Sequence, residues 1–251
     1  QSILQNKDCT AFLVYELFLS TITYKNKSNI SCEQTPKNMY YLDEILSHFP
    51  DARVINLVRD QRDVLLSQKN KWKRKFLGAS SIPLFEAIRS FVNYHPLLTS
   101  KVWASSLQHS KKYKNHNRVK IVKFEELVSN SEETIKMVCS FLEIEFQEKM
   151  LSIPVIRSST EVDSKLHHID SSKIAKWKKG GLSNAEIYLS QIMSVDMMRL
   201  FQYELKKFKF PPILILFYLL ILPMKVGLAF FLNLHRMGNV LEVIKKRFLQ
   251  K

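Results

Sequence analysis

The sequence predicts an α/β fold with a central parallel sheet flanked by helices. Two short apolar runs are typical of buried strands, one at residues 54–58 and one at residues 119–124, and a helical pattern follows each of them. Strands that alternate with helices at this spacing are typical of an α/β domain with a parallel sheet. The 251 residues include 46% hydrophobic and 24% charged residues, which is an ordinary balance for a globular protein.

The first fifty residues contain two predicted helices and one predicted strand. Residues 10–19 are mostly apolar and predict a helix, which is followed by a polar loop. The segment 30–32 predicts a short buried strand that runs into Glu33-Gln34-Thr35-Pro36. Residues 39–48 predict a second helix, because three apolar side chains recur on one face: Leu42, Ile45 and Leu46.

The run at residues 54–58 has four apolar residues in five, which favours a central parallel strand over a half-exposed one. It ends at Arg59-Asp60, where a helical pattern starts at once. A long helical region covers residues 81–110 and is interrupted near Pro96. Two capping-box patterns then each open a helix with apolar spacing: Ser129-Asn-Ser-Glu132 and Ser183-Asn-Ala-Glu186.

The formal charge of +15 indicates an anionic partner. A nucleic acid, a phosphorylated cofactor, an acidic glycan or an anionic membrane would all fit such a field. No helix-turn-helix, zinc or aromatic-sheet signature accompanies the charge, so we expect no nucleic-acid partner. The basic residues gather in four clusters: Lys71, Lys73, Arg74 and Lys75; Lys111, Lys112 and Lys114; Lys176, Lys178 and Lys179; Lys245, Lys246 and Arg247.

Glycine and cysteine usage excludes several classes of site. The chain has five glycines and contains neither a G-x-x-x-x-G-K-[ST] nor a G-x-G-x-x-G pattern, which counts against a nucleotide kinase with a Walker loop. Its three cysteines are far apart and form no C-x-x-C pair. We therefore expect no disulfide framework, no metal site and a reducing compartment.

The last forty residues differ in kind from the rest, and the chain divides into a domain at residues 1–208 and an apolar, basic extension at residues 209–251. Residues 213–222 and 226–234 are apolar, with Pro223 and Lys225 between them. Ten residues span about half of a hydrocarbon layer of ~30 Å, so the pattern favours an interfacial or re-entrant membrane anchor. The alternatives are a buried helical hairpin and a true membrane span.

Arg59 and Ser67 form a candidate phosphate-binding pair. Arg59 follows a predicted parallel strand, and ligands of open α/β folds bind at that edge of the sheet. Its guanidinium offers a planar fork to a phosphate dianion. Ser67 lies about two helical turns later, where its hydroxyl can donate to the same group. An Arg-x7-Ser spacing alone arises by chance in many proteins.

Four blocks in order resemble the sulfotransferases that use 3′-phosphoadenosine-5′-phosphosulfate (PAPS). Together they cover roughly residues 30–205, and their joint occurrence is far more specific than any one of them. The blocks are Glu33-Gln34-Thr35-Pro36-Lys37-Asn38, Ile55-Asn56-Leu57-Val58-Arg59-Asp60-Gln61-Arg62-Asp63 through Ser67, Lys123-Phe124-Glu125-Glu126-Leu127, and Ser171-Ser172-Lys173-Ile174-Ala175-Lys176-Trp177-Lys178-Lys179.

The resemblance implies a P-loop NTPase-like sulfotransferase fold with an apolar C-terminal helical extension. It implies that Arg59 and Ser67 bind the 3′-phosphate of PAPS, and that Trp177 with Lys176 or Lys178 closes over the nucleotide. The alternative for Trp177 is a core residue beneath a basic loop. Gln34 stands where the family usually has a catalytic lysine, and an amide can donate a hydrogen bond there but supplies no cation.

Residues 1–29 show neither a loop for the 5′-phosphosulfate nor a catalytic base, so the sequence is expected to be an incomplete, inactive fragment. The resemblance implies sulfuryl transfer to a hydroxyl, and we expect a glycan or glycolipid acceptor at a membrane surface. The cytoplasmic side is favoured, with the Golgi lumen as the alternative if an N-terminal anchor has been lost. A competing hypothesis is a membrane-surface adaptor without catalysis.

Overall fold

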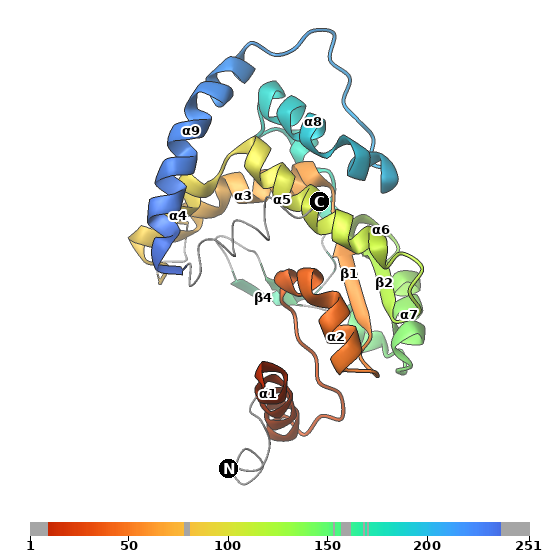
Figure 1. Cartoon of the computed structure of the whole chain (residues 1–251). Helices are drawn as coiled ribbons and strands as arrows, with labels where there is room; N and C mark the ends of the chain where they lie inside the picture. The colour runs from red at the N-terminus through yellow and green to blue at the C-terminus, as the bar shows by residue number, and fades with distance from the viewer. Residues whose placement is uncertain are drawn as a thin grey trace. The chain divides into compact units, whose positions relative to one another are not determined.

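The computed structural model describes residues 10–77, 81–152, 154–156, 162–167, 169 and 171–236. The chain divides into two units, residues 1–53 and residues 54–251 (Figure 1). The boundary between them falls immediately before the first strand of the sheet, so all of the strands belong to the second unit.

The first unit contains two α-helices and a 3-10 helix: α1 (Ala11–Lys25), η2 (Pro36–Tyr41) and α2 (Leu42–His48). Thr10 starts α1 by accepting a hydrogen bond from the Leu13 amide at 3.2 Å, and the helix runs six residues beyond the predicted end. Leu42 and Leu46 are buried on one face of α2, as predicted.

The strand predicted at residues 30–32 is wrong. Those residues are irregular, and Ile30 is 65% exposed. The Ser31 and Thr23 hydroxyls share a hydrogen bond of 2.7 Å, which ties the segment to the last turns of α1. An isolated apolar triplet has no neighbouring strand here to satisfy its backbone groups, so burial and pairing are both lost.

The second unit is built on two parallel strands, β1 (Val54–Val58) and β2 (Val119–Lys123), in register from Val54 opposite Val119 to Val58 opposite Lys123. The predicted parallel pairing is confirmed, and the residues after both strands meet at one edge of the sheet. Burial on both faces of β1 is not confirmed, because Ile55 and Leu57 are 39% and 50% exposed. Only the face with Val58 packs into the core, against Leu107, Met197 and Phe201.

Helices cover the Val58 face of this pair of strands. The helical elements up to residue 142 are α3 (Gln61–Asn70), η3 (Lys71–Phe76), α4 (Leu84–Asn93), α5 (Pro96–Lys112), α6 (Phe124–Ser129) and α7 (Ser131–Leu142). The predicted interruption near Pro96 is confirmed, because α4 ends at Asn93 and Pro96 starts α5. The long α8 (Asn184–Leu200) packs against α5 and α3.

The two predicted capping boxes have different outcomes. At Ser183 the box is present in full, with both reciprocal hydrogen bonds between Ser183 and Glu186. At Ser129 it is wrong, because β2 leads directly into α6 and Ser129 becomes the last residue of that helix. The Ser129 hydroxyl donates back to the Glu125 carbonyl at 2.8 Å and is unavailable as a cap.

The segment between α7 and α8 contains elements that the sequence did not predict. The strands β3 (Pro154–Ile156) and β4 (Val162–His167) pair antiparallel. Three short 3-10 helices accompany them: η4 (Glu148–Leu151), η5 (Ser171–Lys173) and η6 (Lys176–Lys179). The last of these carries Trp177.

The apolar extension forms one continuous helix, α9 (Leu214–Asn233), followed by η7 (Leu234–Arg236). The two apolar runs join in this one helix through Pro223: a proline removes one backbone donor and kinks a helix, but the residues on both sides keep the helical path. No residue of α9 is buried, which does not fit the alternative of a buried hairpin. Within the described residues α9 alone is long and apolar enough to cross a membrane, judged by length and composition.

Candidate functional site

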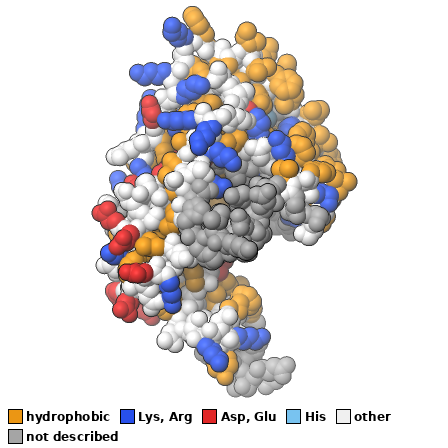
Figure 2. Space-filling view, turned by 180° about the vertical axis from the view of Figure 1, so that it is seen from behind, with side chains coloured by type: hydrophobic (Ala, Val, Ile, Leu, Met, Phe, Trp, Pro, Cys, Tyr) orange, Lys and Arg blue, Asp and Glu red, His pale blue; other side chains and the backbone are white. Residues whose placement is uncertain are grey.

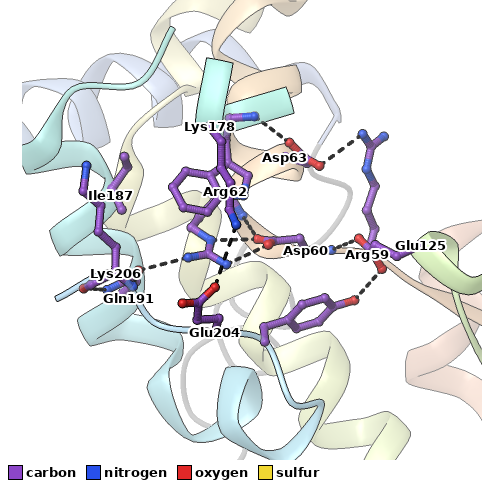
Figure 3. A network of polar contacts seen from close by, with 12 residues as sticks. Arg59, Asp60, Arg62, Asp63, Glu125, Lys178, Ile187, Gln191, Glu204 and Lys206 are labelled. Atoms are coloured by element: carbon purple, nitrogen blue, oxygen red, sulfur yellow. Dashed lines mark hydrogen bonds and ion pairs between the residues drawn. The ribbon is translucent and has the colours of Figure 1, made fainter. Parts of the chain in front are cut away.

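The backbone around Arg59 is fixed at the carboxyl end of β1 by groups from two other elements, of which Figure 3 labels Glu125. The Trp103 indole of α5 donates to the Arg59 carbonyl at 3.1 Å. The Asp60 amide donates to a Glu125 oxygen of α6 at 2.9 Å. Asp60 also caps α3, since its carboxylate accepts from the Arg62 amide at 2.8 Å. The strand-to-helix junction is therefore held rigidly where a ligand would bind.

The Arg59 guanidinium is held on several sides yet stays partly exposed. It lies 4.3 Å above the ring centre of Phe124, and its Nη2 donates to the Lys173 carbonyl at 2.6 Å. The same nitrogen is 3.6 Å from Asp63 Oδ2. The side chain is 27% exposed, and its buried Nε has no hydrogen-bond partner among the described residues. Arg59 therefore keeps a partly exposed cation at the edge of the sheet.

Arg62, three residues on, has a structural role. Its guanidinium is almost completely buried and makes a bidentate pair with Asp60 at 3.0 and 2.8 Å. A third nitrogen reaches Gln191 of α8 at 3.3 Å, and the group lies 3.9 Å above the ring of Trp177. With its charge neutralised and its donors occupied, Arg62 positions the site and is not available to a ligand.

Asp63 links Arg59 to the segment that carries Trp177. Its carboxylate is buried and accepts from the Trp177 amide at 2.9 Å (Figure 3). Burial raises the pKa of Asp63, and this effect outweighs the Trp177 amide and the Arg59 charge, which both lower it. Asp63 thereby places Arg59 and residue 177 on the same side of α3.

Trp177 fits the alternative reading of a core residue. It is 7% exposed and packs with Leu66 and Ile187, while Arg62 covers one face of the ring. Its indole Nε1 is buried and has no partner among the described residues. Lys176 and Lys178 are exposed beside it, and Lys178 Nζ lies 3.8 Å from Glu204. The closing of these three residues over a nucleotide stays a prediction.

Ser67 is exposed on α3, one helical turn after Asp63 and on the same face. The spacing thus places Ser67 on the side of α3 that carries Asp63, the partner of Arg59, and the joint binding of a phosphate by Arg59 and Ser67 stays a prediction. Gln34 is exposed in the irregular segment before η2, in the other unit of the chain. The hydroxyl and the guanidinium are donor groups that a phosphate dianion accepts well, so the residues present fit the 3′-phosphate of a nucleotide.

Sequence reasoning did not assign the roles of Glu125 and Tyr203. Glu125 accepts from the Asp60 amide and from the Tyr203 hydroxyl, the latter at 3.0 Å. Burial, and then the Glu125 carboxylate, raise the pKa of Tyr203, which therefore stays a donor. Glu125 lies within the Lys123–Leu127 block, but nothing in the sequence connects that block to a tyrosine almost eighty residues later.

Metal-ligand clusters are absent from the part of the chain that the structure describes, where no group of three or more His, Cys, Asp or Glu could hold an ion. An α/β fold with an arginine at the carboxyl edge of its parallel strands is typical of proteins that bind anionic ligands. The comparisons with known proteins specify the class further.

The family model described as "Sulfotransferase family" matches residues 4–148. The chain belongs to this family, and the predicted sulfotransferase-like fold and transferase class are confirmed. A sulfotransferase domain from the curacin biosynthetic pathway is similar, with 20% identity and a TM-score of 0.50 over 77% of this chain and 68% of that one. A sulfotransferase domain from the Synechococcus PCC 7002 olefin synthase has 18% identity and a TM-score of 0.53 over 77% and 65%. No curated protein sequence matched the chain.

Proposed function

We propose that the chain binds PAPS and takes part in transfer of its sulfuryl group to a hydroxyl of a glycan or glycolipid. The observation that carries this proposal is the partly exposed guanidinium of Arg59, whose backbone is fixed at the carboxyl edge of the sheet. Sulfuryl transfer is the activity of the family, and the family generally uses PAPS as its donor.

In this reaction the acceptor oxygen attacks sulfur and forms a new S–O bond, while the bond from sulfur to the 5′-phosphate oxygen breaks. The acceptor proton passes to a base, and adenosine 3′,5′-bisphosphate leaves. Positioning and electrostatics do most of the work in such transfers. Arg59 and Ser67 would hold the 3′-phosphate, which both substrate and product carry, so their contribution is to binding and orientation of the nucleotide.

The carboxylate of Asp63 affects how Arg59 would bind a phosphate. Its buried carboxylate lies 3.6 Å from the Arg59 guanidinium and takes a hydrogen bond from the Trp177 amide. A phosphate bound at Arg59 is attracted by the guanidinium but repelled by the nearby carboxylate of Asp63. The raised pKa of Asp63 reduces that repulsion as the pH falls. Asp63 is therefore a positioning residue for Arg59, and Lys176 and Lys178 supply further positive charge near the same segment.

A second function is favoured by Gln34, which stands where the family usually has lysine. A neutral amide cannot neutralise charge on the transferring group, as a lysine would. A nucleotide-binding adaptor at a membrane would need no such cation. Sulfuryl transfer to a panel of glycan and glycolipid acceptors, compared between the wild type and Gln34→Lys, separates the two functions. Turnover that is undetectable in both, with nucleotide binding intact, would favour the adaptor.

Calorimetry with adenosine 3′,5′-bisphosphate and with AMP tests the donor proposal. The bisphosphate should bind more tightly, and Arg59→Ala should weaken it by ~1.5–3 kcal/mol, the scale of a hydrogen bond to a charged group. Arg59→Lys should recover part of this, because lysine keeps the charge but loses the planar fork. The matched control is Arg199→Ala, since Arg199 is exposed on α8 away from this cluster. Equal affinities for the two nucleotides would overturn the proposal.

A further inference from the structure

Two helices of the second unit expose one large apolar surface. Figure 2 shows hydrophobic side chains gathered along the edge of the molecule formed by α9. A contiguous apolar surface of this kind indicates an interaction site with another protein or a membrane. Its exposed members, here called the α4–α9 face, are Leu84, Phe85, Ile88 and Phe91 of α4 and Leu216, Phe217, Leu220, Met224, Val226, Leu228 and Phe231 of α9.

One side of α9 is attached to the domain along its whole length. Half-buried residues recur every three or four positions along that side, at Ile215, Tyr218, Leu222, Lys225, Ala229 and Leu232. The spacing is that of one helix face, which therefore packs on the domain while the rest of α9 stays exposed. The helix is long enough to cross a membrane, since twenty residues extend about 30 Å. Only part of the circumference of α9 is exposed, however, and this exposed strip runs along the whole helix.

Four sets of polar contacts fasten this side. His95 donates from Nε2 to the Tyr218 carbonyl at 2.9 Å. Lys225 Nζ donates to the Phe91 and Tyr94 carbonyls, at 3.1 and 3.0 Å, where the last turn of α4 leaves carbonyls without helical partners. Near the end of the helix, Arg89 donates to Asn233 at 2.9 Å, and Arg236 pairs with Glu86 at 2.6 Å.

These contacts count against a membrane-spanning position for α9. A span would either break them or carry α4, with its own charged residues, into the hydrocarbon. It would also place Lys225 near the centre of the bilayer, where a charge costs about 2.5–3.5 kcal/mol on insertion scales. As docked, the Lys225 ammonium instead satisfies two carbonyls and lies against the ring of Phe91, 4.7 Å from its centre.

The charges around the face complement an anionic lipid surface. Residues 64–85 and residues 205–236 contain no aspartate or glutamate. The first stretch runs through η3, which packs against α4, and the second leads into α9. Basic residues close to a membrane each add up to ~1 kcal/mol of attraction to anionic lipid. Those of the two stretches are Lys69, Lys71, Lys73, Arg74 and Lys75, and Lys206, Lys207, Lys209, Lys225 and Arg236.

We propose that the α4–α9 face lies flat on an anionic lipid bilayer, with α9 in the plane of the interface and α4 contributing to the same contact. The apolar side chains enter the boundary between headgroups and acyl chains. The exposed basic residues of the two stretches contact the headgroups, whereas Lys225 keeps its bonds to the carbonyls of Phe91 and Tyr94. This surface goes beyond the proposed transfer reaction, because it requires neither donor binding nor turnover.

Flotation of the full chain with lipid vesicles tests the proposal. The chain should bind vesicles of phosphatidylcholine with about 30% phosphatidylserine more tightly than phosphatidylcholine alone. In about 0.5 M salt the anionic preference should shrink while binding to both vesicles persists, because only the charge contribution is screened. A chain that stays with the soluble fraction in both lipids would overturn the proposal, as would a soluble dimer that covers the face.

The role of α4 has its own matched control. Leu84→Asn/Ile88→Asn should weaken binding about tenfold or more, because two exposed apolar side chains of the face are lost. Val102→Asn/Ile192→Asn removes side chains of similar exposure from α5 and α8 and should change binding by less than about twofold. All four positions are exposed, and thermal melts verify that both variants fold. Equal losses in the two variants would overturn the assignment of α4 to the contact.

Depth measurements distinguish a flat helix from a span. A bimane label at Phe217→Cys, Met224→Cys or Phe231→Cys, in a chain whose native cysteines are serine, reports depth through quenching by brominated lipids. All three labels should lie at the same shallow depth, because the positions are exposed along one length of α9. A deep label at position 224 between two shallow ones would indicate a span and overturn the proposal. Calorimetry of nucleotide binding without lipid should be the same for all of these variants, so a failure here leaves the donor proposal intact.

Discussion

The two ends of α3 lie next to surfaces of different kinds, one with paired buried charges and one with exposed apolar side chains. At the end next to β1, buried charges are paired within the chain: Asp60 with Arg62, and Asp63 with Arg59. At the other end, α3 runs into the basic η3, which packs on α4. There the apolar side chains of α4 and α9 stay exposed. The ten residues of α3 separate the two regions by about 15 Å.

The two regions differ in the kind of group that lacks a partner. Around Arg59 the buried donors and acceptors are satisfied except for a few, among them Arg59 Nε and Trp177 Nε1. The group there that can bind a small anion is the partly exposed Arg59 guanidinium. Around α9 polar groups and half-buried apolar side chains dock the helix, while the apolar side chains of the α4–α9 face stay exposed. A nonpolar phase or a large apolar partner would complete that surface.

The largest effect is expected at the polar end, from Asp60→Ala. The change removes the α3 cap and leaves the almost completely buried Arg62 without its bidentate partner. Breaking such a pair should lower the free energy of unfolding by about 3–5 kcal/mol. Urea denaturation measures the change. Asp196→Ala, at an exposed position of α8, is the control and should shift stability by less than about 0.5 kcal/mol.

A loss below about 1 kcal/mol for Asp60→Ala would mean that Arg62 finds other partners or water, and that the polar end is less rigid than its contacts indicate. The end of α3 next to β1 would then not depend on the Asp60–Arg62 ion pair for its stability. Leu84→Asn/Ile88→Asn provides the opposite case, since exposed apolar positions should contribute little to unfolding.

The polar end was the more predictable of the two regions. The parallel strands, the α3 start and the position of Arg59 follow from the Val-Arg-Asp block and the apolar runs, because local pattern decides them. The burial of Trp177 does not follow, since it depends on Arg62 stacking over the ring and on Leu66 and Ile187 from other helices. Contacts between residues far apart in the sequence, such as Glu125 with Tyr203, leave no periodic signal.

The apolar end was predicted in composition but not in form. Pro223 and Lys225 suggested a broken helix, because each is unfavourable inside an isolated apolar segment. In the structure Lys225 is occupied by the carbonyls at the end of α4, so its charge holds α9 in place. The docking partner lies more than 130 residues earlier in the chain. The sequence alone could not identify it.

A smaller effect is expected from Glu186, which connects α8 to the last turn of α3 and to the residue after α4. This fully buried carboxylate accepts from Lys69 of α3 and the Ser183 amide, both at 2.7 Å, and from the Tyr94 hydroxyl. Burial alone would raise the pKa of Glu186, but the hydrogen bonds from Lys69, Tyr94 and Ser183 outweigh it and lower the pKa. Glu186→Gln should lower the free energy of unfolding by about 1–3 kcal/mol near neutral pH.

The pH dependence gives the sign of this contribution. Because the folded-state pKa of Glu186 is lowered, its stabilisation is complete above the ordinary value of 4.5 and is lost as the pH falls through the folded-state value. Denaturation curves of wild type and Glu186→Gln should therefore differ near pH 7 and converge as the pH falls below 4.5. A gap that stays constant over this range would show that folding leaves the pKa of Glu186 unshifted, and that its hydrogen bonds do not favour the ionised carboxylate.

The smallest effect is expected from Lys225→Met, where two opposing contributions compete. Burial lowers the pKa of Lys225, which means that the charged form is held at some cost. Against this, the ammonium makes two bonds to carbonyls at the end of α4, and hydrogen bonds to a charged group contribute about 1.5–3 kcal/mol each before that cost. We expect the bonds to prevail, so the substitution should lower the free energy of unfolding by about 1 kcal/mol.

Hydrogen exchange should be faster in α9 and in the last turn of α4 of Lys225→Met than in the wild type. It should not be faster in the control Lys209→Met, because Lys209 is exposed ahead of α9. With a lowered folded-state pKa, the wild type should also gain on the variant as the pH rises towards the ordinary lysine value of 10.5. A variant more stable than the wild type would show that desolvation prevails, and that α9 is held by its apolar contacts alone.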